Sequence, residues 1–128
     1  MSSEQPRTVT LPTADHGPVA IPEPSWCRGH ADHRPDTHRV DLDHKGPEHR
    51  LTHDGELLWT AFLGEAPYAS QPQARVLGVY VEQGSYARTL DAVGLYDLAA
   101  TFEAHADRLR ELADQLGALL TKETPGEA

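Results

Sequence analysis

The sequence predicts an α+β fold, in which a small antiparallel sheet of three or four strands combines with a long C-terminal helix and a metal-ordered N-terminal loop. Two apolar stretches flank a turn sequence at 54–55, which indicates a β-hairpin. A stretch rich in β-branched residues follows at 74–81. Beyond residue 89 the apolar residues change to a helical period. These three features together define the fold class.

The sheet is expected between residues 48 and 88. Residues 49–52 and 57–63 read as the two strands of a hairpin, because Asp54-Gly55 between them accepts the positive φ angles of a tight turn. Residues 74–81 read as a further strand because Val76, Val79 and Val81 favour extended backbone and no turn residues interrupt them before 82.

The C-terminal helix is expected over residues 89–121. Its apolar side recurs at spacings of three and four, which places it along one face. The residues of this face are Leu95, Leu98, Phe102, His105, Leu109, Leu112, Leu116 and Leu119. Thr89 or Asp91 is expected to cap the first turn, because both side chains accept hydrogen bonds from free backbone N–H groups.

The second half of this helix is expected to extend beyond the sheet. A helix of about 30 residues measures about 45 Å, whereas a strand spans about 17–20 Å. An apolar face without a strand beneath it needs another partner. We therefore expect a homodimer contact through Leu109, Leu112, Leu116 and Leu119.

Both ends of the chain are expected to be disordered. Residues 1–23 contain four prolines among polar residues, and residues 122–128 are polar, so neither segment offers enough apolar surface to offset the entropy of ordering. A single α+β domain is expected over residues 24–121. It would consist of a Cys/His loop at 24–53, the sheet at 48–88 and the helix at 89–121.

The composition excludes several classes of protein. The net charge is −9, with 20 acidic and 11 basic residues, and no basic run is present, so nucleic-acid binding is not expected. No apolar run reaches the roughly 18 residues of a transmembrane helix, and a membrane association is not expected. The single cysteine excludes an internal disulfide, and no secretory signal is recognisable. The expected location is the cytoplasm.

The segment 25–53 concentrates the residues that bind zinc. It holds Cys27 and six of the eight histidines but almost no large apolar residue, so it needs another force to order it. Cys27 and His30 have a C-x2-H spacing that lets both side chains reach one ion, and Gly29 between them permits a tight turn. We predict a structural zinc bound by Cys27 together with three further ligands. The candidates are His30, His33, His38 and His44, and His49 is a further alternative.

A second interpretation of the same segment needs no metal. A polar loop can be rich in surface histidine, with Cys27 packed as a small apolar residue beside Trp26. The metal interpretation is favoured because zinc coordination supplies on the order of 10 kcal/mol or more to folding.

The chain also resembles a family of small uncharacterised actinobacterial proteins, which is grouped as a domain of unknown function. The resemblance rests on Pro24-Ser25-Trp26-Cys27, the following Asp32-His33, the later His44-Lys45-Gly46-Pro47, and an Ala/Leu-rich C-terminal helix. It covers about residues 24–120. It implies that Cys27, His30 or His33, and His44 occupy the family's Cys/His positions, and it implies no known activity.

The expected function is that of a non-enzymatic, zinc-stabilised binding or regulatory accessory protein with a protein partner. One alternative is a small metal-dependent enzyme that uses the Cys/His cluster, with Asp43 or Glu48 as the base. The H-E-x-x-H and P-loop motifs are both missing from the sequence, which disfavours this alternative. Another is an acidic protein that mimics nucleic acid. We therefore expect no catalytic residues.

Overall fold

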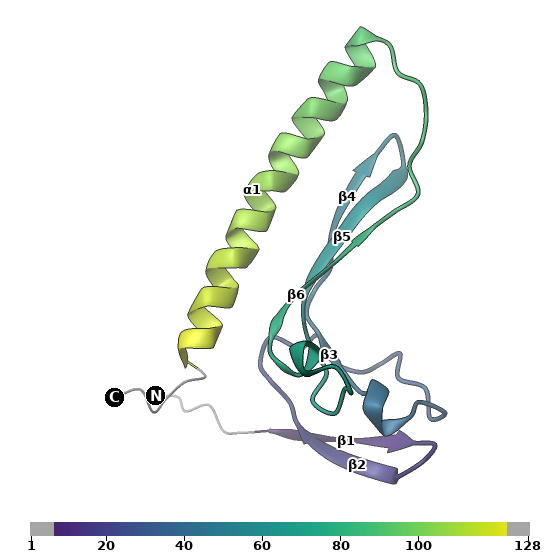
Figure 1. Cartoon of the computed structure of the whole chain (residues 1–128), viewed down its shortest axis with the longest axis vertical. Helices are drawn as coiled ribbons and strands as arrows, with labels where there is room; N and C mark the ends of the chain where they lie inside the picture. Colours follow the sequence, from purple (N-terminus) through teal and green to yellow (C-terminus); the bar gives the residue numbers. More distant parts are fainter. Residues whose placement is uncertain (1–6, 123–128) are drawn as a thin grey trace. The chain divides into compact units, whose positions relative to one another are not determined.

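The computed structural model describes residues 7–122 and confirms the predicted α+β class. Its elements are a two-stranded antiparallel sheet, a second sheet of four strands and one long C-terminal helix (Figure 1). The described chain divides into two compact units. The first unit comprises residues 7–47 and 63–78, and the second comprises residues 48–62 and 79–122.

The first unit begins with a β-hairpin. Strand β1 (Thr8–Thr13) pairs with β2 (Gly17–Pro22) in antiparallel register, so that Leu11 lies opposite Val19. Gly17 closes the turn with a φ of +62°, in the left-handed region that suits glycine. The Thr13 hydroxyl donates a hydrogen bond of 2.7 Å to the Gly17 carbonyl, which fixes the hairpin end.

This hairpin differs from the disordered arm that the composition suggests for residues 1–23. Leu11 and Ile21 are buried on one face of the hairpin, and Ile21 is fully shielded from solvent. Together with Leu42 they form an apolar cluster, and Val9, Val19 and Tyr68 pack against it. The hairpin therefore gains its burial from residues distant in sequence, which a local count of prolines and polar residues does not reveal. Residues 1–6 of the expected arm lie outside the described part.

The segment after β2 is ordered by contacts with the hairpin and with β5. It contains a short 3-10 helix, η1 (Arg39–Asp41), and the two-residue strand β3 (His44–Lys45), which pairs with Gly64 and Glu65 at the end of β5. The Thr37 carbonyl accepts a hydrogen bond of 2.9 Å from the Ala14 amide of the hairpin turn. Leu42 anchors the same segment in the apolar cluster.

The second unit contains the hairpin predicted at Asp54-Gly55. Strand β4 (His49–His53) pairs with the first part of β5 (Glu56–Glu65), and both turn residues have positive φ angles, +52° and +79°. The register shifts between Leu51 and Thr52, so Leu51 faces Trp59 whereas Thr52 faces Leu57. This part of the sheet is confirmed, and the bulge is an addition that the sequence does not predict.

The last strand begins later than the expected residue 74. Pro72 starts a second 3-10 helix, η2 (Pro72–Arg75), because its fixed φ suits the first helical position. Strand β6 (Gly78–Gln83) then pairs with β5.

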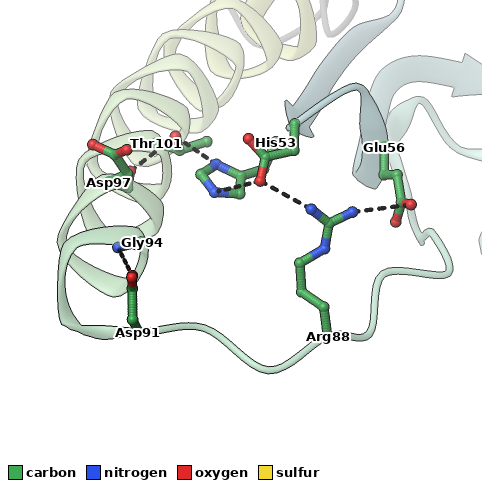
Figure 2. A network of polar contacts seen from close by, with 8 residues as sticks. His53, Glu56, Arg88, Asp91, Gly94, Asp97 and Thr101 are labelled. Carbon is green, nitrogen blue, oxygen red and sulfur yellow. Dashed lines mark hydrogen bonds and ion pairs between the residues drawn. The ribbon is translucent and has the colours of Figure 1, made fainter.

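The C-terminal helix α1 runs from Ala92 to Lys122. The Asp91 carboxylate accepts a hydrogen bond of 2.8 Å from the Gly94 amide, so Asp91 is the residue that caps the first turn (Figure 2). Lys122, which the sequence assigns to the disordered tail, is the last helical residue, and residues 123–128 lie outside the described part. Within residues 7–122, no helix has the length and apolarity needed to cross a bilayer.

The apolar face of α1 is unevenly buried. Only His105 and Leu112 are buried along the helix, and Leu112 is 3% exposed within a single chain. The most exposed apolar side chains belong to the first half of the helix, namely Val93, Leu95, Tyr96 and Phe102. Leu112 therefore already takes part in intrachain packing.

Candidate metal centre

Four side chains of the first unit converge in a group that could hold a metal ion. Glu23, Cys27, His30 and His44 each offer one ligand atom, and these atoms all lie within 4.8 Å of one another. Glu23 follows β2, Cys27 and His30 belong to the next loop, and His44 opens β3. The metal centre thus joins three consecutive segments of the first unit.

The loop geometry brings the Cys27 and His30 side chains together. Gly29 has a φ of +101°, and its amide donates a hydrogen bond of 3.4 Å to Cys27 Sγ. This turn places His30 Nε2 at 3.6 Å from the same sulfur. The C-x2-H spacing therefore produces the convergence that the sequence indicates, with glycine at the position that requires a left-handed backbone.

Glu23 occupies the middle of the group. Its Oε1 atom lies 2.9 Å from His30 Nε2 and 3.2 Å from His44 Nδ1. The His44 contact has the distance of an ion pair but lacks hydrogen-bond geometry. Nδ1 of His44 is consequently a buried polar atom without a hydrogen-bond partner. Such atoms are rare because an unsatisfied buried group costs about 1–3 kcal/mol.

The orientation of His44 is fixed by aromatic neighbours. Its side chain is 3% exposed. The ring lies edge-on to Trp26, with ring centroids 6.1 Å apart, and 5.5 Å from the ring of His30. Gly46 follows two residues later, where an added Cβ would meet Leu63 Cβ at 3.3 Å and the Trp26 carbonyl at 3.4 Å. A small residue at 46 therefore lets the chain pass close to Trp26.

The protonation states of Glu23 and His44 suit a cation, whereas the Cys27 thiol must lose its proton to bind one. Burial lowers the pKa of His44 below its ordinary value, which outweighs the opposite effect of Glu23 and favours the neutral imidazole that metals bind. Burial alone would raise the pKa of Glu23, but hydrogen bonding with His30 and Cys27 outweighs it and keeps the carboxylate ionised. Burial raises the pKa of the Cys27 thiol, and the nearby Glu23 carboxylate adds to this effect. Without a cation, the thiol is therefore protonated.

The predicted ligands divide into two sets. Cys27, His30 and His44 are members of the group, whereas His33 and His38 are not. His33 Nε2 instead lies 2.8 Å from the Pro12 carbonyl of the hairpin, and His38 precedes η1 with an exposed side chain. Glu23 is not among the predicted ligands, because it belongs to residues 1–23, whose composition suggests disorder. Its position four residues before Cys27 is the signal that could have identified it.

A polar cavity of about 270 Å³ adjoins the metal centre. It is open to solvent and contains charged groups of both signs. The lining side chains with charge or metal-binding capacity are Arg28, His30, Asp32, His33, Asp43 and Lys45. His30 alone belongs to both the cavity and the metal centre.

Comparison with known proteins identifies one family. Neither the curated proteins nor the solved structures yield a match. A family model described as a domain of unknown function, DUF6907, matches residues 8–118. This match begins with the β1–β2 hairpin and includes the metal centre and most of α1, so it treats the hairpin as part of the domain. The chain therefore belongs to the DUF6907 family.

Proposed function

We propose that the chain is a non-enzymatic binding or regulatory accessory protein of the cytoplasm, stabilised by a structural zinc ion bound by Glu23, Cys27, His30 and His44. The observation that carries this proposal is the buried Nδ1 atom of His44, which has no hydrogen-bond partner and faces three further ligand groups. A metal ion at this position would satisfy that atom. Ligation by Cys27 requires a free thiol, which a reducing compartment preserves.

The donor set favours zinc over other common cations. A thiolate with two imidazoles suits zinc, whereas calcium and magnesium prefer a shell of oxygen atoms. Four protein ligands complete a tetrahedron, which is typical of structural zinc sites. With one carboxylate and one thiolate, the bound site would be neutral overall, so its charge would be balanced within the first unit.

The position of the ligands supports a structural role. They connect the end of β2 with β3 across a loop of about twenty residues that contributes few large apolar side chains. The apolar core of this unit is small: among the described residues, the cluster that orders the hairpin has three buried members, Leu11, Ile21 and Leu42, and Trp26, Leu63 and Leu77 are also buried. Small cores of this kind often depend on a metal ion, because the free energy of metal binding adds directly to folding.

Metal analysis of the purified full-length chain tests the proposal. We expect about one zinc per chain, as four ligands of a single tetrahedral site imply. Cys27→Ser should remove most of this zinc, whereas His33→Gln, in the same loop but outside the group, should retain it. A chelator should lower the melting temperature of the wild type and of His33→Gln. Protein prepared without chelator that contains no metal and melts at an unchanged temperature in chelator would contradict the proposal.

The polar cavity beside His30 favours a second candidate, a small metal-dependent enzyme. A catalytic zinc has three protein ligands and a water molecule at an open position. If Glu23 acted as a base instead of a ligand, the site would have this form and would face the cavity through His30. Cobalt substitution distinguishes the two, because a four-ligand site gives a d–d spectrum that is insensitive to added anions. A spectrum that changes with azide would favour the enzyme.

The proposed accessory role also requires a partner. We propose a protein partner, and self-association through the partly buried residues Leu109, Leu116 and Leu119 of α1. Leu112, the fourth residue of the predicted contact, is buried within the single chain. It would therefore pack beneath the dimer surface instead of contacting the partner directly.

A further inference from the structure

Histidine side chains line the contact between α1 and β4. Alternate residues of β4 point to the same side of a strand, and His49, Leu51 and His53 are its partly or fully buried residues, whereas Arg50 and Thr52 are exposed. Helix α1 runs alongside this strand (Figure 1). We call the contact formed by His49, Leu51 and His53 with the facing side of α1 the α1–β4 interface.

The helix contributes a third histidine to the α1–β4 interface. His105 is 9% exposed, and its Nε2 atom is buried without a hydrogen-bond partner. Burial lowers the pKa of His105, and the nearby His49 and Arg108 lower it further. His105 is therefore held neutral, and the charged groups that act on it are cationic or become cationic with acid. Among the described residues, the charged groups that shift the pKa of His105 are His49 and Arg108, and neither is acidic.

The other end of the interface is formed by His53. Its Nδ1 atom lies 3.5 Å from the Thr101 hydroxyl of α1, and its Nε2 atom lies 3.7 Å from the Asp54 carboxylate (Figure 2). Asp54 is already engaged by Arg88, whose guanidinium bridges Asp54 at 2.9 Å and Glu56 at 3.0 Å. The Asp54 carboxylate near His53 thus already has a cationic partner in Arg88.

We propose that the α1–β4 interface is a proton-sensitive contact, which releases α1 from the strand when the pH falls below about 6.5. Histidine is the side chain that gains charge in this range, and a charge in an apolar contact is strongly disfavoured. A proton on His105 would add positive charge next to Arg108. The ligands of the metal centre belong to the first unit, whereas the α1–β4 interface belongs to the second.

The sign of the effect follows from the lowered pKa of His105. The neutral form stabilises the packed helix fully above the ordinary histidine pKa of about 6.5, and this contribution is lost as the pH falls from there toward the lower pKa of the packed state. Between pH 7.5 and 5.5, one such histidine changes the ratio of packed to released helix by at most about tenfold.

Hydrogen exchange of the full-length chain tests the proposal. After correction for intrinsic rates, we expect exchange in residues 98–116 and 49–53 to be several-fold faster at pH 5.5 than at pH 7.5, with an upper limit of about tenfold. His105→Leu, which fills a similar volume without a titrating group, should reduce this change to about twofold or less. His105→Gln should do the same if the leucine variant folds poorly. His16→Gln, an exposed histidine of the first unit, should keep the full response of the wild type.

The readout separates this proposal from the metal centre. Loss of metal in acid would appear in residues 23–45, whereas release of the helix appears in α1 and β4. A wild-type chain whose helix exchanges equally at both pH values would overturn the proposal. The proposal would also be overturned if the pH-dependent change in hydrogen exchange were the same in both His105 variants as in the wild type.

Discussion

Glu23 Oε1 lies 3.2 Å from Nδ1 of His44, which connects the residue after β2 to the first residue of β3. The contact joins a carboxylate whose pKa is lowered to an imidazole whose pKa is also lowered. An ionised carboxylate beside a neutral imidazole forms no ion pair, but both groups are in the state that a cation requires. The first unit is therefore prepared for a metal ion before one binds.

Glu23→Gln tests whether this carboxylate is a ligand. The amide keeps the size of the side chain but loses its charge, so we expect zinc affinity to fall by more than the roughly 10–100-fold that loss of an outer-shell partner causes. Competition with a chromogenic chelator measures this. Glu48→Gln, which changes an exposed carboxylate beyond the group, serves as the control. A loss below about 100-fold would place Glu23 outside the ligand set.

The β1–β2 hairpin should be essential for the stability of the first unit. Ile21 is fully buried, so Ile21→Ala should lower the free energy of unfolding by about 2–5 kcal/mol. Val40 is half exposed, and Val40→Ala should change the free energy of unfolding by less than about 0.5 kcal/mol. Urea denaturation followed by fluorescence in a Trp59→Phe background, where Trp26 is the remaining tryptophan, reports on this unit. Equal midpoints for Ile21→Ala and the wild type would mean that the hairpin contributes nothing.

Two glycines should respond to alanine in opposite directions. A Cβ at Gly84 would collide with the Leu57 carbonyl, and the backbone cannot yield without breaking the 2.7 Å hydrogen bond from the Gly84 amide to the Leu58 carbonyl. Gly84→Ala should therefore destabilise by about 1–3 kcal/mol. Gly117 has open space around it in α1, and Gly117→Ala should stabilise by up to about 1 kcal/mol. Thermal melts that shift in the same direction for both would contradict this packing.

The Asp91 cap should determine where α1 begins. Asp91→Ala removes the acceptor for the Gly94 amide and should cost about 0.5–2 kcal/mol. Asp97→Ala, on the exposed surface of the next turn, keeps the backbone carbonyl that accepts the Thr101 hydroxyl at 3.1 Å (Figure 2) and is the matched control. Amide chemical shifts of residues 92–96 should move only for Asp91→Ala. Equal melting temperatures for Asp91→Ala and Asp97→Ala would show that Asp91 does not stabilise α1 as a cap.

Self-association should depend on the partly buried face of α1. Leu116→Glu places a charge where a dimer would exclude water, so the mass measured by light scattering should fall to that of a monomer while helix content is retained. Ala118→Glu, on the exposed side of the same turn, should leave the mass unchanged. A wild type that is already monomeric at high concentration would refute the dimer.

Short sequence patterns were sufficient to predict almost all of the secondary structure of the second unit. Asp54-Gly55 can form one tight hairpin turn, and the apolar spacing of three and four after Leu95 is compatible only with a helix, so β4, β5 and α1 were predictable. The start of β6 was less predictable, because Pro72 initiates a 3-10 turn inside a stretch that otherwise favours strand.

The ligands of the metal centre likewise differ in how far the sequence predicts them. The short-range pair Cys27 and His30 follows from spacing and from Gly29, which are properties of a few adjacent residues. Only the tertiary structure decided the rest. Glu23 joins the group because the buried cluster of Leu11, Ile21 and Leu42 orders the hairpin that precedes it, and His44 joins because β3 pairs with the end of β5. Both depend on contacts between residues far apart in the chain, whose free energy no local pattern records.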